Sequence, residues 1–147
     1  MHIWIDTEFN EFKGQLISLA LVASDGREFY EVVPCDNPGP WVATNVMPIL
    51  GKAAIPYQLM QQRLQGWLMQ FDTIHIIADW PEDIEHFCAA LICGPGVRIN
   101  TPPLTMEIRR DLNGASQLPH NALADAKANR LAQLSQEETQ RVETWKF

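Results

Sequence analysis

The alternation of hydrophobic and polar residues predicts three strands in the first part of the chain. Apolar residues dominate positions 2–6 and 15–23, and residues 27–33 alternate Phe, Glu and Val with Tyr and Val. Alternation with a period of two is typical of a strand, and a short apolar run is typical of a buried one. Ser24-Asp25-Gly26 is a strong turn signal, so the second and third strands are expected to form a hairpin.

After residue 33 the spacing of apolar residues changes. Residues 34–40 hold three prolines and a glycine, which predicts a loop. Beyond this loop, apolar residues recur every three or four positions in some segments and run together in others. The segments predict, in order, helices over 41–50 and 57–71, a strand over 73–78, a helix from Pro81, a strand over 97–100 ended by Pro102-Pro103, a helix over about 121–132, and a last helix from Ser135, which has capping-box spacing with Glu138.

The order of these elements indicates the fold class. Three strands with hairpin-like connections precede alternating helices and strands. This order favours an α/β protein with a mixed five-stranded sheet, three antiparallel strands and then parallel ones, flanked by helices. A length of 147 residues fits a single domain over residues 1–147.

Composition and charge narrow the range of partners. With 46% hydrophobic and 20% charged residues, the chain is expected to fold rather than to be disordered. Its net charge of −7 makes it a poor candidate for coating long duplexes, which takes clustered Lys and Arg. Residues 109–147 hold six basic and five acidic side chains, whereas the preceding residues hold five and thirteen. This modest basic region is better suited to binding short single-stranded ends of nucleic acids than long duplexes.

The cysteines and the absence of a long apolar run predict the compartment. Three cysteines without a CxxC spacing are expected to be buried free thiols: Cys35, Cys88 and Cys93. No stretch approaches the roughly 18–20 apolar residues of a membrane span, and Asp6 and Glu8 lie where a signal peptide has its apolar core. We therefore expect a cytoplasmic protein that makes no membrane contact. Its apolar helices would support a homodimer, and three tryptophans are expected in the core or in such an interface: Trp41, Trp67 and Trp145.

Asp6 and Glu8 end the first predicted strand with the pattern Asp-x-Glu. Residues i and i+2 of a strand point to the same face, so both carboxylates are expected to project together. Two such close carboxylates resist ionisation unless a cation lies between them, and a hard divalent ion such as Mg²⁺ or Mn²⁺ suits oxygen ligands. Taken alone, the pattern is more often that of an exposed strand end.

Two further groups of residues have the chemistry to complete such a site. His120 lies in a predicted loop, and Asp125 follows it five residues later on the second turn of a predicted helix. Asp79 and Asp83 follow the fourth predicted strand, at a helix start where the helix dipole also favours carboxylates. Each group alone is common by chance, but their order along the chain makes chance a weaker explanation.

The set resembles the DEDDh family of 3′–5′ exonucleases, which have a ribonuclease-H-like fold. Asp6-Thr7-Glu8-Phe9 is similar to the first motif of that family, and His120 with Asp125 matches the His-x4-Asp spacing of the third. The resemblance covers nearly the whole chain and is closest to a small branch of exoribonuclease-like members from bacteria and phages. The segments that match this branch are Leu16-Ile17-Ser18-Leu19, Asp25-Gly26-Arg27-Glu28-Phe29, and Trp41-Val42 with Val46, Pro48 and Leu50.

The resemblance implies a hydrolase that releases nucleoside 5′-monophosphates stepwise from the 3′ ends of single-stranded RNA or DNA. It also implies two divalent metal ions, Mg²⁺ or Mn²⁺, as cofactors. Asp6 would bridge the two ions, and Glu8 and Asp125 would complete the shell of one. Asp83 would hold the other ion through water. His120 would take the proton of the attacking water.

The second motif departs from the family pattern. Family members often have Asn at the strand end and the catalytic Asp four residues later on the helix. In this chain Asp79 occupies the Asn position and Asp83 the catalytic one. We favour Asp83 as the catalytic carboxylate, because Ile84 and Phe87 after it are apolar and suited to face the sheet. Asp79 remains its competitor.

Phe9 and Trp80 are candidate substrate contacts, although a packing role suits each of them as well. Phe9 directly follows Glu8, and Trp80 lies between the competing aspartates, where it would stack on a base. The main alternative function is a non-catalytic nucleic-acid or protein-binding module on the same fold, and a purely structural or regulatory role is the third. All five catalytic side-chain types are present, which argues against lost turnover. The sequence leaves RNA and DNA undistinguished, because a single contact to a 2′-hydroxyl could decide between them.

Overall fold

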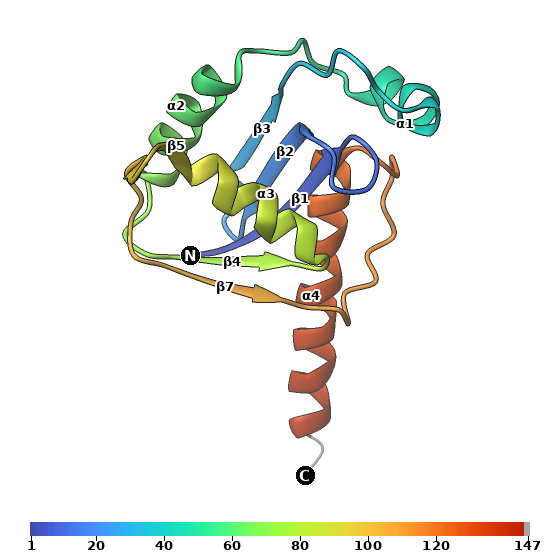
Figure 1. Cartoon of the computed structure of the whole chain (residues 1–147). Coiled ribbons are helices and arrows are strands. Elements are labelled where there is room, and N and C mark those ends of the chain that lie inside the picture. Colours follow the sequence, from blue (N-terminus) through green and yellow to red (C-terminus); the bar gives the residue numbers. More distant parts are fainter. Residues whose placement is uncertain (146–147) are drawn as a thin grey trace.

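The computed structural model describes residues 1–145, which form a five-stranded sheet with helices on both faces (Figure 1). The strand order is β3-β2-β1-β4-β7. The strands of this sheet are β1 (His2–Phe9), β2 (Leu16–Ala23), β3 (Glu28–Val32), β4 (Ile74–Ala78) and β7 (Leu104–Ile108). The helices are α1 (Pro40–Asn45), the short 3-10 helix η1 (Met47–Ile49), α2 (Tyr57–Leu68), α3 (Pro81–Leu91) and α4 (Ala122–Thr144).

The pairing of the strands confirms the predicted mixed sheet. β1 pairs with β2, and β2 with β3, in antiparallel register, whereas β1 pairs with β4, and β4 with β7, in parallel register. The antiparallel half follows from the hairpin turn at residues 24–26. The parallel half follows from the crossover connections, because a helix between two parallel strands must return the chain to the end of the sheet at which the first strand began. The fold is therefore α/β and ribonuclease-H-like.

The two faces of β1 belong to different layers of the core. Ile3 and Ile5 pack with buried residues of α2 and α3, such as Leu64 and Phe87. The even-numbered positions face the other way, toward α4, and Trp4 is buried there. Because side chains alternate along a strand, the later odd-numbered residues of β1 lie on the face of Ile3 and Ile5, and the later even-numbered residues lie on the α4 face.

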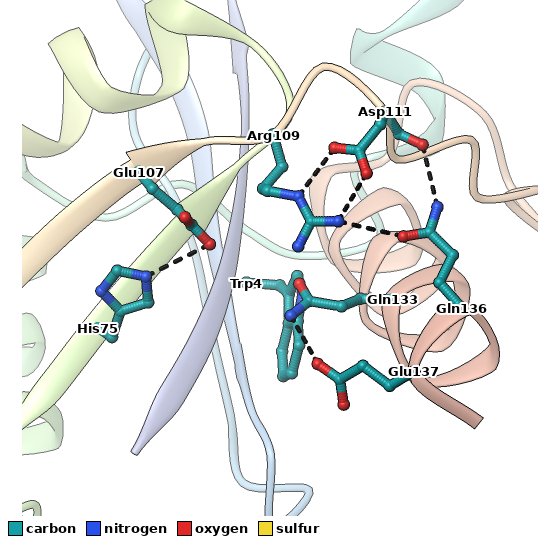
Figure 2. Close-up of polar contacts among 8 residues, drawn as sticks. All are labelled: Trp4, His75, Glu107, Arg109, Asp111, Gln133, Gln136 and Glu137. Atoms are coloured by element: carbon teal, nitrogen blue, oxygen red, sulfur yellow. Dashed lines mark hydrogen bonds and ion pairs between the residues drawn. The ribbon is translucent and has the colours of Figure 1, made fainter. Parts of the chain in front are cut away.

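Polar contacts hold α4 against its face of the sheet (Figure 2). The indole Nε1 of Trp4 donates a hydrogen bond to Gln133 Oε1 at 3.0 Å. Arg109 forms two hydrogen bonds with the carboxylate of Asp111, and its guanidinium also donates to Gln136. Gln136 in turn donates to the carbonyl of Asp111, so the chain after β7 is tied to the middle of α4. These contacts fix the direction in which α4 presents its first turn.

The structure corrects the predicted fifth strand. Residues 97–100 do not join the sheet; Val97–Arg98 (β6) pairs with Ile92–Gly94 (β5) in a small separate hairpin. The fifth strand of the sheet is β7, which follows the two prolines rather than preceding them. Its side chains are half-buried or exposed because it lies at the sheet edge, so it lacks the apolar run that marks a central strand.

The helices and the first strand also differ from prediction. No new helix starts at Ser135, because α4 runs unbroken over 23 residues that contain neither Gly nor Pro and are rich in strong helix formers. The predicted helix over 41–50 is divided into α1 and η1. β1 extends past the predicted apolar run over residues 2–6 and ends at Phe9, so that it includes Asp6, Thr7 and Glu8.

Three other expectations can be compared with the described residues. The cysteines are free, as expected, but Cys93 is exposed and Cys35 and Cys88 are half-buried, so the prediction of buried thiols is wrong. Trp67 is in the core, whereas Trp41 and Trp145 lie outside it, 54% and 88% exposed. Among residues 1–145, no helix has the length and apolar character needed to cross a membrane.

Candidate active site

The acidic residues converge where β1 and β4 separate. The parallel pairing of these strands ends at Trp4 and Ile77, so the part of β1 beyond Trp4 has no neighbour on that side. The carboxyl ends of parallel strands are the usual place for ligand sites in α/β sheets, because the chain leaves the sheet there toward different helices. α3 begins just after β4, and its first turn reaches this gap.

Asp6 and Glu8 project toward the α4 face of the sheet, as the Asp-x-Glu spacing predicts. Asp125 lies in the first turn of α4, one turn earlier in the helix than expected. Asp6, Glu8 and Asp125 each offer an oxygen, and these atoms all lie within 4.8 Å of one another. Residues far apart in the sequence thus form one group of three half-buried carboxylates.

A second group of carboxylates forms on the other side of Asp6. Asp6, Asp79 and Asp83 also offer oxygens within 4.8 Å of one another. Asp83 is buried, and its Oδ1 accepts hydrogen bonds from the Thr7 N–H at 3.0 Å and from Thr7 Oγ1 at 2.6 Å. The structure therefore brings both competing aspartates to the site, and Asp6 belongs to both groups.

The electrostatics of this cluster favour protonated carboxyl groups. Burial, followed by the charges of Asp83 and Glu8, raises the pKa of Asp6 well above its usual value. Burial and the charges of Asp125 and Asp83 raise the pKa of Glu8 to about 8. Burial raises the pKa of Asp83 to about 7, although the Thr7 hydrogen bonds act against this shift, and burial also raises the pKa of Asp79. The cluster therefore holds more carboxylates than its own surroundings can neutralise.

The donor set fits hard divalent cations. Within these two groups, three buried carboxylate oxygens have no hydrogen-bond partner among the described residues: Asp79 Oδ1, Asp83 Oδ2 and Asp125 Oδ1. None of the ion pairs within residues 1–145 involves a carboxylate of either group. Buried polar atoms are normally satisfied, and clustered carboxylate oxygens are the ligands that Mg²⁺ and Mn²⁺ prefer.

His120 lies in the loop directly before α4 and is exposed. Its backbone has a φ of 68°, in the left-handed region that non-glycine residues rarely adopt. Its N–H donates a hydrogen bond to Asp125 Oδ2 at 3.1 Å, while Oδ1 of the same carboxylate belongs to the buried unpartnered set. The ring of His120 meets that of Trp41 edge to face, with centroids 4.9 Å apart.

The two candidate substrate contacts lie on different sides of the site. Phe9 belongs to the α3 face of β1, and its ring lies 5.0 Å from that of His86 on α3. Trp80 is 46% exposed just before α3. The guanidinium of Arg110 lies over the Trp80 ring, 4.5 Å from its centroid.

Arg110 also donates a hydrogen bond to the carbonyl oxygen of Asp79 at 2.5 Å. One face of Trp80 is therefore covered by a cation that is anchored beside the carboxylate cluster. The indole Nε1 of Trp80 donates to Glu82 Oε2, which fixes the ring in its plane.

Sequence reasoning missed Thr7 and Trp41 at this site, and it had Arg110 only as one of the basic residues of the region 109–147. Thr7 had a usable signal, because its position between two carboxylates of a strand places it on the opposite face, toward the helix that carries Asp83. The contacts of Arg110 and Trp41 had no local signal, since they depend on how the chain after β7 and α1 are placed in three dimensions.

The fold and this centre define the class: a ribonuclease-H-like α/β protein with five carboxylates and one histidine gathered at the end of its central parallel strands. No protein-family model matches the chain. Two proteins described as 3′-5′ exoribonucleases, from the CDC 1551 and H37Rv strains of Mycobacterium tuberculosis, are each 32% identical to the chain over 148 residues, covering 86% of the chain and 88% of the relative. The chain belongs to the family of these exoribonucleases.

Proposed function

We propose that the chain is a metal-dependent 3′–5′ exonuclease of the DEDDh family, in its small bacterial and phage branch. It releases nucleoside 5′-monophosphates from the 3′ ends of single-stranded RNA or DNA. The observation that carries the proposal is the pair of carboxylate groups that share Asp6, with His120 hydrogen-bonded through its backbone to Asp125. The names of the two relatives support the direction of cleavage and the class of substrate.

In this proposal the residues that would hold metal are divided between two positions. Asp6, Glu8 and Asp125 would hold one ion, and Asp6 with Asp83 the other. When bound, a pair of divalent cations, Mg²⁺ or Mn²⁺, stabilises the attacking and leaving oxygens and lowers the pKa of a bound water. Asp79 offers a further unpartnered oxygen on the second side.

Asp83 is the stronger candidate for the second-motif carboxylate. The two hydrogen bonds from Thr7 hold its Oδ1, so the carboxylate has one orientation and Oδ2 is left available. Asp79 lacks the Thr7 contacts; against the effect of burial, hydrogen bonds with its own backbone and with the Asn129 side chain, and the charge of the Arg110 guanidinium, each lower its pKa, so its negative charge is already partly compensated. We assign Asp83 the main role and Asp79 an auxiliary one.

His120 acts as the general base. Its ring is exposed, so it can reach an attacking water, and its backbone is fixed to Asp125, which itself belongs to the first carboxylate group. A neutral imidazole has one unprotonated ring nitrogen that can accept a proton, which is what a general base requires. Asp125 would thus couple the position of the base to the position of the metal.

The substrate contacts are a base or sugar at Phe9 and a phosphate at Arg110 supported by Trp80. Because Arg110 already covers one face of Trp80, a base would stack only on the other face, and the guanidinium is the natural partner of a phosphate. With a net charge of −7, the protein presents this cation locally rather than as a basic surface.

The deciding experiment uses an oligonucleotide labelled at its 5′ end, as RNA and as DNA of the same sequence, with Mg²⁺, Mn²⁺ or EDTA. We expect products that shorten by one nucleotide at a time from the 3′ end, release of 5′-monophosphates, and no cleavage in EDTA. Asp6→Ala should abolish cleavage at every metal concentration. Binding of the oligonucleotide by a folded protein that releases no product with either metal would instead favour a non-catalytic binding module.

A further inference from the structure

We propose that Trp41 is a positioning residue that sets the orientation of the His120 ring. The inference rests on the proposed function, since it concerns the residue to which we assign proton transfer. It starts from the edge-to-face contact between the two rings, whose centroids lie 4.9 Å apart at an interplanar angle of 87°.

The His120 ring has few other restraints. Among the described residues, no hydrogen bond reaches either of its nitrogens; only the backbone N–H is bonded, to Asp125. The side chain is exposed and belongs to a residue with positive φ, so burial does not select its rotamer. Edge-to-face packing against an aromatic ring is a directional contact and restricts where the imidazole can turn.

Trp41 is itself held from the side of β1. Asn10 directly follows β1 and donates to the carbonyl of Asn37 at 2.8 Å, while its own side-chain oxygen accepts the N–H of Gly39 at 2.8 Å. Gly39 is the residue before α1, and Trp41 lies in the first turn of that helix. The end of the strand that carries Asp6 and Glu8 therefore fixes the start of α1.

The other end of the same segment is tied to the start of α4. Asn121 Nδ2 donates to the carbonyl of Ile49 at 3.0 Å, and the Tyr30 hydroxyl donates to the carbonyl of Leu50 at 2.8 Å. Asn121 is adjacent to His120 and caps α4 by accepting the N–H of Ala124. Residues 39–50 thus connect the carboxyl end of β1 to the amino end of α4, with Trp41 against His120 between the two.

The exposure of Trp41 argues for a role at the site rather than in the core. Its side chain is 54% exposed and lies outside the hydrophobic clusters, so its aromatic ring is not explained by burial. Its described aromatic partner is His120. A ring that orients the general base affects turnover, whereas a ring that only stacks on a nucleotide affects binding, and this difference can be measured.

The test compares Trp41→Ala, Trp41→Phe and a control, Trp145→Ala, in steady-state cleavage of a single-stranded RNA oligonucleotide. Trp145 is also exposed but lies at the far end of α4, roughly 30 Å from its first turn. We expect Trp41→Ala to lower kcat about tenfold to a hundredfold with KM changed less than about twofold. Trp41→Phe, which keeps a ring at the contact, should recover most of the loss, and Trp145→Ala should behave as wild type. A rise in KM with unchanged kcat, or no effect, would overturn the inference.

A second measurement does not depend on activity. In metal-free and substrate-free protein, the imidazole resonances of His120, assigned with His120→Gln, should be displaced by Trp41→Ala and unaffected by Trp145→Ala. Resonances that stay in place overturn the inference whatever the kinetics show. If the wild-type protein cleaves no oligonucleotide with either metal, but Trp41→Ala displaces the His120 resonances, the proposed function fails and the Trp41–His120 contact is still supported.

Discussion

Thr7 donates two hydrogen bonds to a single oxygen of Asp83, from its N–H at 3.0 Å and from its hydroxyl at 2.6 Å. This contact crosses from the central strand to the first turn of α3, on the face of β1 opposite to Asp6 and Glu8. It leaves the second oxygen of Asp83 buried and unpartnered beside Asp6. A residue between the two carboxylates of the first motif therefore orients the carboxylate of the second.

Thr7→Val should weaken both the site and the fold, because it removes the hydroxyl donor to a buried carboxylate and keeps the side-chain shape. A hydrogen bond to a charged group contributes about 1.5–3 kcal/mol, so the free energy of unfolding should fall by an amount in this range at pH 8, above the Asp83 pKa of about 7, and turnover should fall as Asp83 loses part of its orientation. Urea denaturation and steady-state cleavage measure the two effects. Thr7→Ser is the matched control and should retain most of both. A Thr7→Val protein with wild-type turnover would show that this contact does not serve catalysis.

Asp83→Asn and Asp79→Asn should separate the two competing carboxylates. We expect Asp83→Asn to lower kcat by more than about a hundredfold and Asp79→Asn by less than about tenfold, because the first holds its orientation through Thr7 and the second has Arg110 beside it. Both substitutions keep the side-chain shape, so folding should be preserved and circular dichroism checks it. The reverse order of effects would assign the second motif to Asp79.

The stability of the metal-free protein should fall as the pH rises from about 4.5 to about 8. The folded-state pKa is about 8 for Glu8, against an ordinary 4.5, and about 7 for Asp83, against 3.8. Between these limits the folded protein keeps protons that the unfolded chain has released. The stabilisation is therefore complete below the ordinary pKa values and is lost as the pH passes the raised ones.

Thermal unfolding in EDTA across this pH range measures the effect. Added Mn²⁺ or Mg²⁺ should raise Tm more at pH 8 than at pH 5, because the ligands must be deprotonated to bind. Glu8→Gln, which cannot ionise, should show a smaller pH dependence. A Tm that rises with pH in the absence of metal would contradict the assigned electrostatics.

His120→Ala should lower kcat by about a hundredfold to ten-thousandfold, the usual range for a general base, while the protein keeps its metal-dependent rise in Tm. The carboxylates are unchanged in this variant, so only proton transfer is lost. His75→Ala is a suitable comparison, because His75 lies at the amino end of β4, away from the carboxylate cluster. Unchanged turnover in His120→Ala would remove this histidine from the reaction.

Arg110→Ala should raise KM for an oligonucleotide and flatten its dependence on salt. Removing one cation that contacts a phosphate is expected to reduce the slope of log KM against log salt concentration by about one unit or less. Binding measured between low and moderate salt gives this slope, and Arg110→Lys should restore part of it. Equal slopes for wild type and Arg110→Ala would show that no phosphate meets this guanidinium.

Local periodicity was enough to predict most elements of this fold. The apolar runs of β2 and β4 and the turn at residues 24–26 are strong local signals, and the structure has these elements close to where they are expected. The pattern failed where tertiary context replaces local preference. β7 is a half-exposed edge strand without an apolar run, and the capping-box spacing at Ser135 lies inside a long helix that is rich in strong helix formers and contains neither Gly nor Pro.

The sequence by itself determined that Asp6 and Glu8 share one face of a strand, because side chains alternate with a period of two. It also determined that His120 precedes the helix that carries Asp125. The sequence could not determine which of Asp79 and Asp83 approaches Asp6. Both follow β4 within five residues, and their distances from Asp6 depend on where β1 and β4 separate. The tertiary structure decided that both come within reach, and that Trp41, distant in the chain, lies against His120. Contacts of this kind arise from the packing of α1, α3 and α4 around the end of the sheet, which no local pattern specifies.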